Sequence, residues 1–237
     1  HFIRRRSRVI GAVGQPFIIW IFLSAGFRHS VDAGGAEYGA FLFPGIILLI
    51  ALFASIFSTI SVIEDRKTGF MQGVLTSPAP RAAIVWSKLL AGTTIALLQS
   101  VVFMILLPFT GLSLTWEGML LSAGLLLFVG MTLTGLGFLI SWSMSSTQGF
   151  HAVMNLLLLP LWLLSGAFFP PEGTSDWLAA IIQLNPLYYV TALFQKAFFL
   201  GSGIAMTEGP PILVSVIVFA AFFSLVFILS LRVVRQK

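Results

Sequence analysis

The chain has 237 residues, of which 58% are hydrophobic and only 9% are charged, and its formal net charge is +5. An average soluble domain carries about 25% charged residues, so this composition excludes a water-soluble fold. The chain therefore belongs to the integral membrane proteins.

Uncharged runs divide the chain into candidate membrane spans, each long enough for the roughly 20 residues that cross a bilayer. The longest run, 118–171, is too long for one span, and its middle, Ser143–Gly149, has the polar and glycine-containing sequence of a turn. We therefore predict an all-α membrane protein with six transmembrane helices, because backbone groups in lipid must pair within a helix. The predicted spans are 9–27, 41–62, 88–110, 119–142, 150–169 and 210–231.

Residues 172–200, between the fifth and sixth predicted spans, are apolar but do not form a seventh span. The stretch Leu187–Leu200 would rise only about 21 Å as a helix, whereas the hydrocarbon core is about 30 Å thick. A seventh crossing would also place the basic C-terminal residues outside. We expect an external re-entrant pair of short helices that dips into the outer leaflet and is broken at Asn185 and Pro186.

Lys and Arg residues indicate the orientation, because cytoplasmic loops are enriched in them. With the N-terminus inside, only Arg28 and Lys196 fall on the outer side, and most acidic residues fall outside. The basic residues lie at the cytoplasmic helix ends, where we expect them to face anionic lipid and not nucleic acid. We predict a multi-pass protein of a prokaryotic cell (inner, cytoplasmic) membrane with both termini cytoplasmic. Since the chain starts at His1 without Met, we expect further residues upstream.

The polar segment 63–87 joins the second and third predicted spans on the cytoplasmic side. Four consecutive charged residues, Glu64–Lys67, precede a glycine and a short helix that prolines end. At helical spacing Met71, Val74 and Leu75 share one stripe, which we expect to form an apolar ridge exposed to the cytoplasm. Exposed apolar surface of this kind favours a docked partner over a plain topology anchor. The candidate contact residues are Glu64, Asp65, Arg66, Lys67, Gly69, Phe70, Met71, Val74, Leu75 and Pro78.

Neutral polar residues lie within the predicted spans and are candidates for a substrate pathway. Two interpretations remain open, because such groups either bond neighbouring helices, for about 0.6 to 2 kcal/mol, or contact a substrate. None of the eight acidic residues falls inside a predicted span, which disfavours an ion-coupled carrier. The candidate pathway residues are Gln15, Ser55, Ser58, Thr59, Gln99 and Asn155.

The sequence does not favour an enzyme. His151 and Ser165 lie about 21 Å apart along one predicted helix, whereas a nucleophile and its base must approach within about 3 Å. We expect His151 at the membrane interface or bonded to the preceding turn. The chain has no phosphate-binding G-x-x-x-x-G-K-[ST] sequence, and the absence of Cys excludes disulfides and thiolate metal sites, so no metal site is expected.

Three stretches together resemble the permease subunits of type 2 ABC exporters. The first is the charged, glycine, leucine and proline pattern of segment 63–87. Leu159–Pro170 resembles the exit of the fifth helix in that family, and Asn185–Phe198 resembles the external segment before the last helix. Gln72 and Gln195 depart from the family pattern, in which an acid and an Arg are common. The candidate residues of the external region are Ser165, Gly166, Pro170, Asn185 and Pro186.

The resemblance implies a half-transporter. Two such permease chains, identical or different, would face each other, and separate ABC ATPase (nucleotide-binding) subunits would bind ATP and magnesium and contact segment 63–87. This chain would then be non-catalytic and hold no cofactor. Family members export drugs, lipids and lipid-linked glycans, and the abundant Phe favours a hydrophobic or amphipathic substrate. The alternatives are a stand-alone channel or secondary transporter and, less favoured, a membrane-embedded enzyme.

Overall fold

The computed structural model describes residues 6–27, 38–78, 80–168, 174–200 and 209–235, with only the backbone described for 6–13, 75 and 235. Every regular element in these ranges is a helix, as the sequence predicts. The long helices are α1 (Arg6–Gly26), α2 (Tyr38–Ser58), α5 (Arg81–Met104), α6 (Trp116–Ser143), α7 (Thr147–Trp162) and α10 (Ile212–Arg235). The short ones are α3 (Ile60–Lys67), α4 (Phe70–Leu75), η1 (Leu107–Thr110), η2 (Leu163–Ala167), α8 (Asp176–Leu184) and α9 (Pro186–Phe198).

Five helical segments within the described residues are long and apolar enough to cross a membrane. A sixth candidate exists if α8 and α9, which meet at an angle of 86°, are counted together as one span. Helix α1 overlaps the first predicted span, and its apolar part within the described side chains is Gly14–Gly26. The five segments are Tyr38–Lys67, Arg81–Met104, Trp116–Ser143, Thr147–Ala167 and Ile212–Val234.

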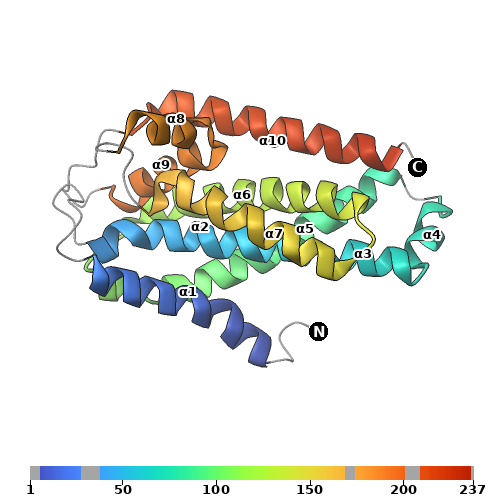
Figure 1. Ribbon diagram of the computed structural model, residues 1–237, viewed down its shortest axis with the longest axis horizontal. Helices are drawn as coiled ribbons and strands as arrows, with labels where there is room; N and C mark the ends of the chain where they lie inside the picture. Colours follow the sequence, from blue (N-terminus) through green and yellow to red (C-terminus); the bar gives the residue numbers. More distant parts are fainter. Residues whose placement is uncertain (1–5, 28–37, 79, 169–173, 201–208, 236–237) are drawn as a thin grey trace.

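Helix α2 forms the centre of the bundle and packs against α1, α5, α6, α7 and α9. Its residues from Phe41 to Leu52 are all buried, which fits a helix that is apolar on every face. Phe43 packs edge-on against Trp20 and Phe198 and stacks with Phe103, at centroid distances of 5.1–6.1 Å. The core is therefore built around one helix, and the others are arranged about it (Figure 1).

The two ends of the bundle differ in charge. At one end, on the right in Figure 1, the chain places α3, α4, the start of α5 and the end of α10. We call this the charged end, because Glu64–Lys67, Arg81, Lys88 and Arg232 lie there. The helices α8 and α9 lie at the opposite end, where Lys196 is the basic residue among those described.

Helix bounds differ from two of the predicted span bounds. The second span is predicted to end at 62, and α3 continues the helical path to Lys67, so Glu64–Lys67 lie on a helix before Gly69. A helix leaving the lipid needs no apolar side chains to persist, which is why charge is a poor marker of its end. The third span was expected at 88–110, but α5 begins at Arg81 and ends at Met104.

Candidate functional site: a groove along α2 and the charged end

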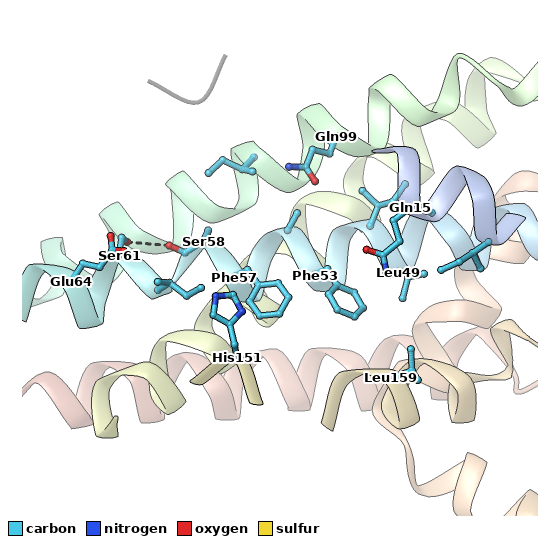
Figure 2. A pocket seen from close by; sticks show the side chains of 16 residues that line it. Gln15, Leu49, Phe53, Phe57, Ser58, Ser61, Glu64, Gln99, His151 and Leu159 are labelled. Atoms are coloured by element: carbon cyan, nitrogen blue, oxygen red, sulfur yellow. Dashed lines mark hydrogen bonds between the residues drawn. The ribbon is translucent and has the colours of Figure 1, made fainter. Parts of the chain in front are cut away.

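A groove of about 690 Å³ follows α2 and α3 from the charged end into the bundle (Figure 2). Its walls come from α1, α2, α3, α5 and α7, because these helices surround one side of α2 without closing over it. Along α2 and α3 the lining runs from Leu49 to Glu64, which corresponds to about 22 Å of helix. The groove therefore reaches from the charged end to the middle of the bundle.

The part of the groove near the charged end is polar. Ser58, Ser61, Glu64 and His151 line it, and the His151 ring lies 4.9 Å from that of Phe57. The hydroxyls of Ser58 and Ser61 donate to the Ser55 and Ser58 carbonyls, at 2.6 and 3.0 Å. The Ser58 oxygen can still accept from a ligand, whereas the Ser61 oxygen already accepts from the Lys88 ammonium at 3.0 Å.

The deeper part of the groove is apolar, with two amides. Phe53, Leu49 and neighbouring aliphatic residues form the wall, and Gln15 of α1 and Gln99 of α5 add two amides to the lining (Figure 2). Gln99 is only 8% exposed. Neither amide makes a hydrogen bond to another described residue. The groove thus combines an apolar wall with unused hydrogen-bonding groups, which is typical of small-molecule sites.

The structure separates the six predicted pathway residues into three groups. Gln15, Ser58 and Gln99 line the groove. Ser55 and Thr59 are buried between helices, where the Thr59 hydroxyl donates to the Ile56 carbonyl at 2.6 Å. Asn155 is exposed on α7 and does not line the groove. The roles of all six stay predictions.

Several groove residues were missed by the sequence reasoning. Phe53 and Phe57 are four residues apart on α2, but the helix is so uniformly apolar that no periodic signal marks this face. Glu64 is predicted only as a partner contact, and His151 is expected at the interface or bonded to the preceding turn. Both line the groove, a position that depends on how α7 packs against α3.

The charged residues of α3 are tied into the bundle. The Lys88 ammonium of α5 donates to the Asp65 carboxylate at 2.6 Å and to the Ser61 hydroxyl at 3.0 Å. The Arg66 guanidinium donates to the Trp142 carbonyl and lies 5.8 Å from the centroid of the Trp142 ring. Trp142 is in the last turn of α6, where a cation is favoured by the helix dipole. These contacts connect α3 to α5 and α6.

Helix α4 does not present the exposed ridge that its sequence pattern suggested. Met71 is only 4% exposed and Val74 packs with it, so both face a cluster of buried residues contributed by α3, α5, α6 and α10. The side chain of Leu75 lies outside the described residues. Phe70, at 64% exposed, is the large apolar residue that α4 presents. The chain turns between α3 and α4 at Gly69, which adopts φ +77°, a conformation that glycine allows.

The expected exposure of Met71 and Val74 is wrong, because buried apolar residues of α3, α5, α6 and α10 cover them. Pro78 follows the end of α4 and is exposed. Beside α4 lies a cleft of about 330 Å³ whose lining includes Arg66, Lys67, Trp142 and Met144. The charged end therefore offers one protruding Phe and one basic cleft.

At the opposite end, Asn185 joins two of the stretches singled out in the sequence. Its amide nitrogen donates to the Leu161 and Leu164 carbonyls at 2.6 and 2.8 Å, and its amide oxygen accepts from the Leu187 amide at 3.0 Å. Those carbonyls lie where α7 gives way to η2 and regular pairing is disturbed. The expected break at Asn185 and Pro186 is confirmed, since α8 ends at Leu184 and α9 begins at Pro186.

The other predicted residues of this region lie in η2 or beyond it. Ser165 is fully buried and donates to the Trp162 carbonyl at 2.6 Å, so its hydroxyl has a structural partner. Gly166 adopts φ +73°, which lets the chain turn there. Pro170 lies outside the described residues.

Comparison with known proteins gives one family match and several relatives. The family described as ABC-2 type transporter matches residues 1–199. The transport permease ycf38 of Porphyra purpurea is 28% identical, covering 78% of this chain and 66% of its own length. YbhR of Escherichia coli K12, named as a multidrug ABC transporter permease, is 25% identical over 68% of this chain and 44% of its own length. The daunorubicin resistance ABC transporter permease protein DrrB1 of Streptomyces coeruleorubidus is 25% identical over 76% of this chain and 64% of its own length.

The chain thus spans less than two thirds of the length of these relatives.

Proposed function

Because this chain belongs to the ABC-2 type transporter family, we propose that it is the membrane-spanning permease subunit of an ATP-driven exporter. In this proposal two permease chains, identical or different, form the substrate path, and separate ABC ATPase subunits bind ATP and magnesium and supply the hydrolysis. The observation that carries the proposal is the family match over residues 1–199. The helical bundle adds a groove that opens at its charged end.

We place the charged end on the cytoplasmic side of the cytoplasmic membrane of a prokaryotic cell. Arg66, Lys67, Arg81, Lys88 and Arg232 lie at this end, and such an excess is what the positive-inside rule associates with the cytoplasm. The bent pair of α8 and α9 then lies at the outer surface and enters the outer leaflet without crossing it.

The surface that receives the ATPase is α3 with α4. Phe70 is 64% exposed on α4, and an exposed aromatic side chain is a good anchor for a partner pocket. The Asp65–Lys88 and Arg66–Trp142 contacts fix α3 to α5 and α6. Displacement of α4 by a closing ATPase is therefore passed to several spans at once, which a floppy linker would not do.

The substrate path includes the groove, and its lining supports a hydrophobic or amphipathic cargo. Phe53, Phe57 and Leu49 supply apolar wall, while polar groups lie at the cytoplasmic mouth. The names of two relatives, which refer to multidrug transport and to daunorubicin resistance, are in keeping with such a cargo. ATP-driven closure would change the groove between inward-open and outward-open forms.

The proposal is tested with Phe70→Asp in the complex purified from its native membrane. We expect the ATPase subunit to be lost from the purified complex, together with Mg-ATP hydrolysis, while the permease chain remains folded and inserted. Phe109→Asp is the matched control, because Phe109 is an exposed Phe on η1 at the opposite end. The proposal is wrong if the wild-type chain moves cargo without any ATPase, as a stand-alone channel or secondary transporter would. The coupling assignment is wrong if Phe70→Asp behaves like its control.

A further inference from the structure

We propose that the amides of Gln15 and Gln99 form a recognition site that selects uncharged hydrogen-bonding groups on an otherwise aromatic or aliphatic cargo. This inference rests on the proposed function, since it names the class of molecule that the groove accepts. It narrows hydrophobic or amphipathic cargo to uncharged or cationic molecules and disfavours anions such as phosphate-linked glycolipids.

Gln99 carries the first step of the argument. Its side chain is 8% exposed, lines the groove and makes no hydrogen bond to another described residue. Its amide atoms are not among the fully buried unpaired atoms, so they reach the groove. In membrane bundles Gln can instead bond a neighbouring helix. Gln99 therefore does not act as helix glue in this structure, and its free donors and acceptor face the space where cargo would lie.

Gln15 lies at nearly the same depth as Gln99. Helices α1 and α5 both run away from the charged end, and they meet where the Trp20 and Phe103 rings lie 6.3 Å apart. Gln15 precedes Trp20 by five residues, or about 7.5 Å, and Gln99 precedes Phe103 by four, or about 6 Å. Both amides thus lie within about two turns of the Trp20–Phe103 contact, on its charged-end side. A ligand at this depth of the groove meets hydrogen-bonding groups from two helices (Figure 2).

The charges around the groove argue against anionic cargo. Among the described side chains that line the groove there is no Lys or Arg, and the charged one is Glu64 at the mouth. The nearby Lys88 ammonium is already bonded to Asp65 and Ser61. An anion would lose its hydration without gaining a cation from these described residues, and it would first pass a carboxylate. Uncharged and cationic molecules avoid both penalties.

The size of the groove agrees with a small molecule. Its volume of about 690 Å³ lies within the range of about 300–1,000 Å³ of small-molecule pockets. The apolar wall of Phe53 and Leu49 lies beside the amides, so one molecule can place an aromatic body on the wall and a polar group on Gln99. The site therefore recognises a small apolar molecule that carries a hydrogen-bonding group.

The experiment uses cysteine labelling, which is clean because the chain contains no Cys. Ala54→Cys places one thiol in the groove, and its reaction with N-ethylmaleimide is followed in the full permease–ATPase complex in nanodiscs. Three probes share one aromatic body: N-phenyl-1-naphthylamine has an N–H donor, 1-phenylnaphthalene has none, and 8-anilinonaphthalene-1-sulfonate adds a negative charge. They are compared at equal concentration in the lipid.

We expect N-phenyl-1-naphthylamine to protect the thiol at a concentration about 3- to 10-fold lower than 1-phenylnaphthalene, the effect of about one hydrogen bond. The sulfonate should protect least. Gln99→Met keeps the side-chain length without the amide and should make the two neutral probes equal, as should Gln99→Leu. Gln183→Met, on exposed α8, is the matched control and should leave the difference intact.

Three results would overturn the site: equal protection by the two neutral probes in the wild-type background, protection by the sulfonate as strong as by the amine, or a thiol that does not react at all. These results are separate from the proposed function. Selective protection in a chain that binds no ATPase would keep the site and reject the exporter. ATP-driven transport with unselective protection would keep the exporter and reject the recognition site.

Discussion

Replacement of Asn185 by Ala tests how the corner between α8 and α9 is held. The change removes hydrogen bonds to the Leu161 and Leu164 carbonyls and the bond from the Leu187 amide at the start of α9. Interhelical hydrogen bonds in membrane proteins average about 0.6 kcal/mol, and loss of an N-cap costs about 1 kcal/mol. Two bonds and one cap give about 2 kcal/mol, rising to about 4 kcal/mol if the carbonyls stay buried and unpaired.

The free energy of unfolding is measured by titrating the purified chain from mild detergent into SDS and following the loss of helical circular dichroism. Asn185→Asp separates the contributions, because a carboxylate still accepts from Leu187 but donates to neither carbonyl, so it should destabilise at least as much as Ala. Gln183→Ala, on the exposed side of α8, is the control and should stay within about 0.5 kcal/mol of wild type. If Asn185→Ala behaves like this control, the corner is held by something other than these bonds.

Two further predictions concern packing near the charged end. Asp65 and Lys88 form an ion pair whose side chains are 27% and 21% exposed. A double-mutant cycle with Asp65→Asn and Lys88→Met should therefore give a coupling of only about 0.5–1 kcal/mol in the free energy of unfolding. If the effects of the two single changes are additive, the pair contributes nothing to stability. Gly92→Ala should destabilise by about 1–3 kcal/mol, because the added Cβ would lie 2.5 Å from the Ser58 and Thr134 oxygens. Gly124→Ala, where a Cβ meets nothing within 4 Å, should instead stabilise by up to about 1 kcal/mol, and the same sign for both would contradict the close packing of α5 against α2 and α6.

The order of the long helices could be predicted because lipid imposes a simple rule on composition. A span needs about 20 residues without charge, so the gaps between charged residues located α2, α5 and α10. The helices α6 and α7 share one uncharged run, and the polar turn Ser143–Gly149 separated them. The rule says little about where a helix ends outside the lipid. A helix can continue through charged residues once it is outside the lipid. The absence of charge therefore did not predict that α3 extends to Lys67.

The faces of the helices were harder to predict than their positions. In a soluble helix the polar face marks the outside, but α2 has apolar residues on every face. Phe53 lines the groove and Phe43 lies in the core, although the two have the same side chain. Met71 shows the same limit in α4, since the partner surface that buries it comes from helices distant in sequence.

Polar residues within the predicted spans were better indicators of the groove than apolar ones. The sequence did not show which of them line the groove and which are buried between helices. Gln99 and Ser55 both lie on long helices and look alike as isolated polar residues in apolar surroundings. Ser55 is buried in helix packing, whereas Gln99 faces the groove, and only the rotation of α2 and α5 about their axes decides between these outcomes.

The segment Tyr38–Lys67, made of α2 and α3, is a continuous helical path whose 30 residues form part of the groove wall and part of the charged end. A replacement near Arg66 that tilts this helical segment would reshape the groove wall around Phe53 from a distance. Under the proposed function, a change of cargo could therefore arise at residues that never touch the cargo.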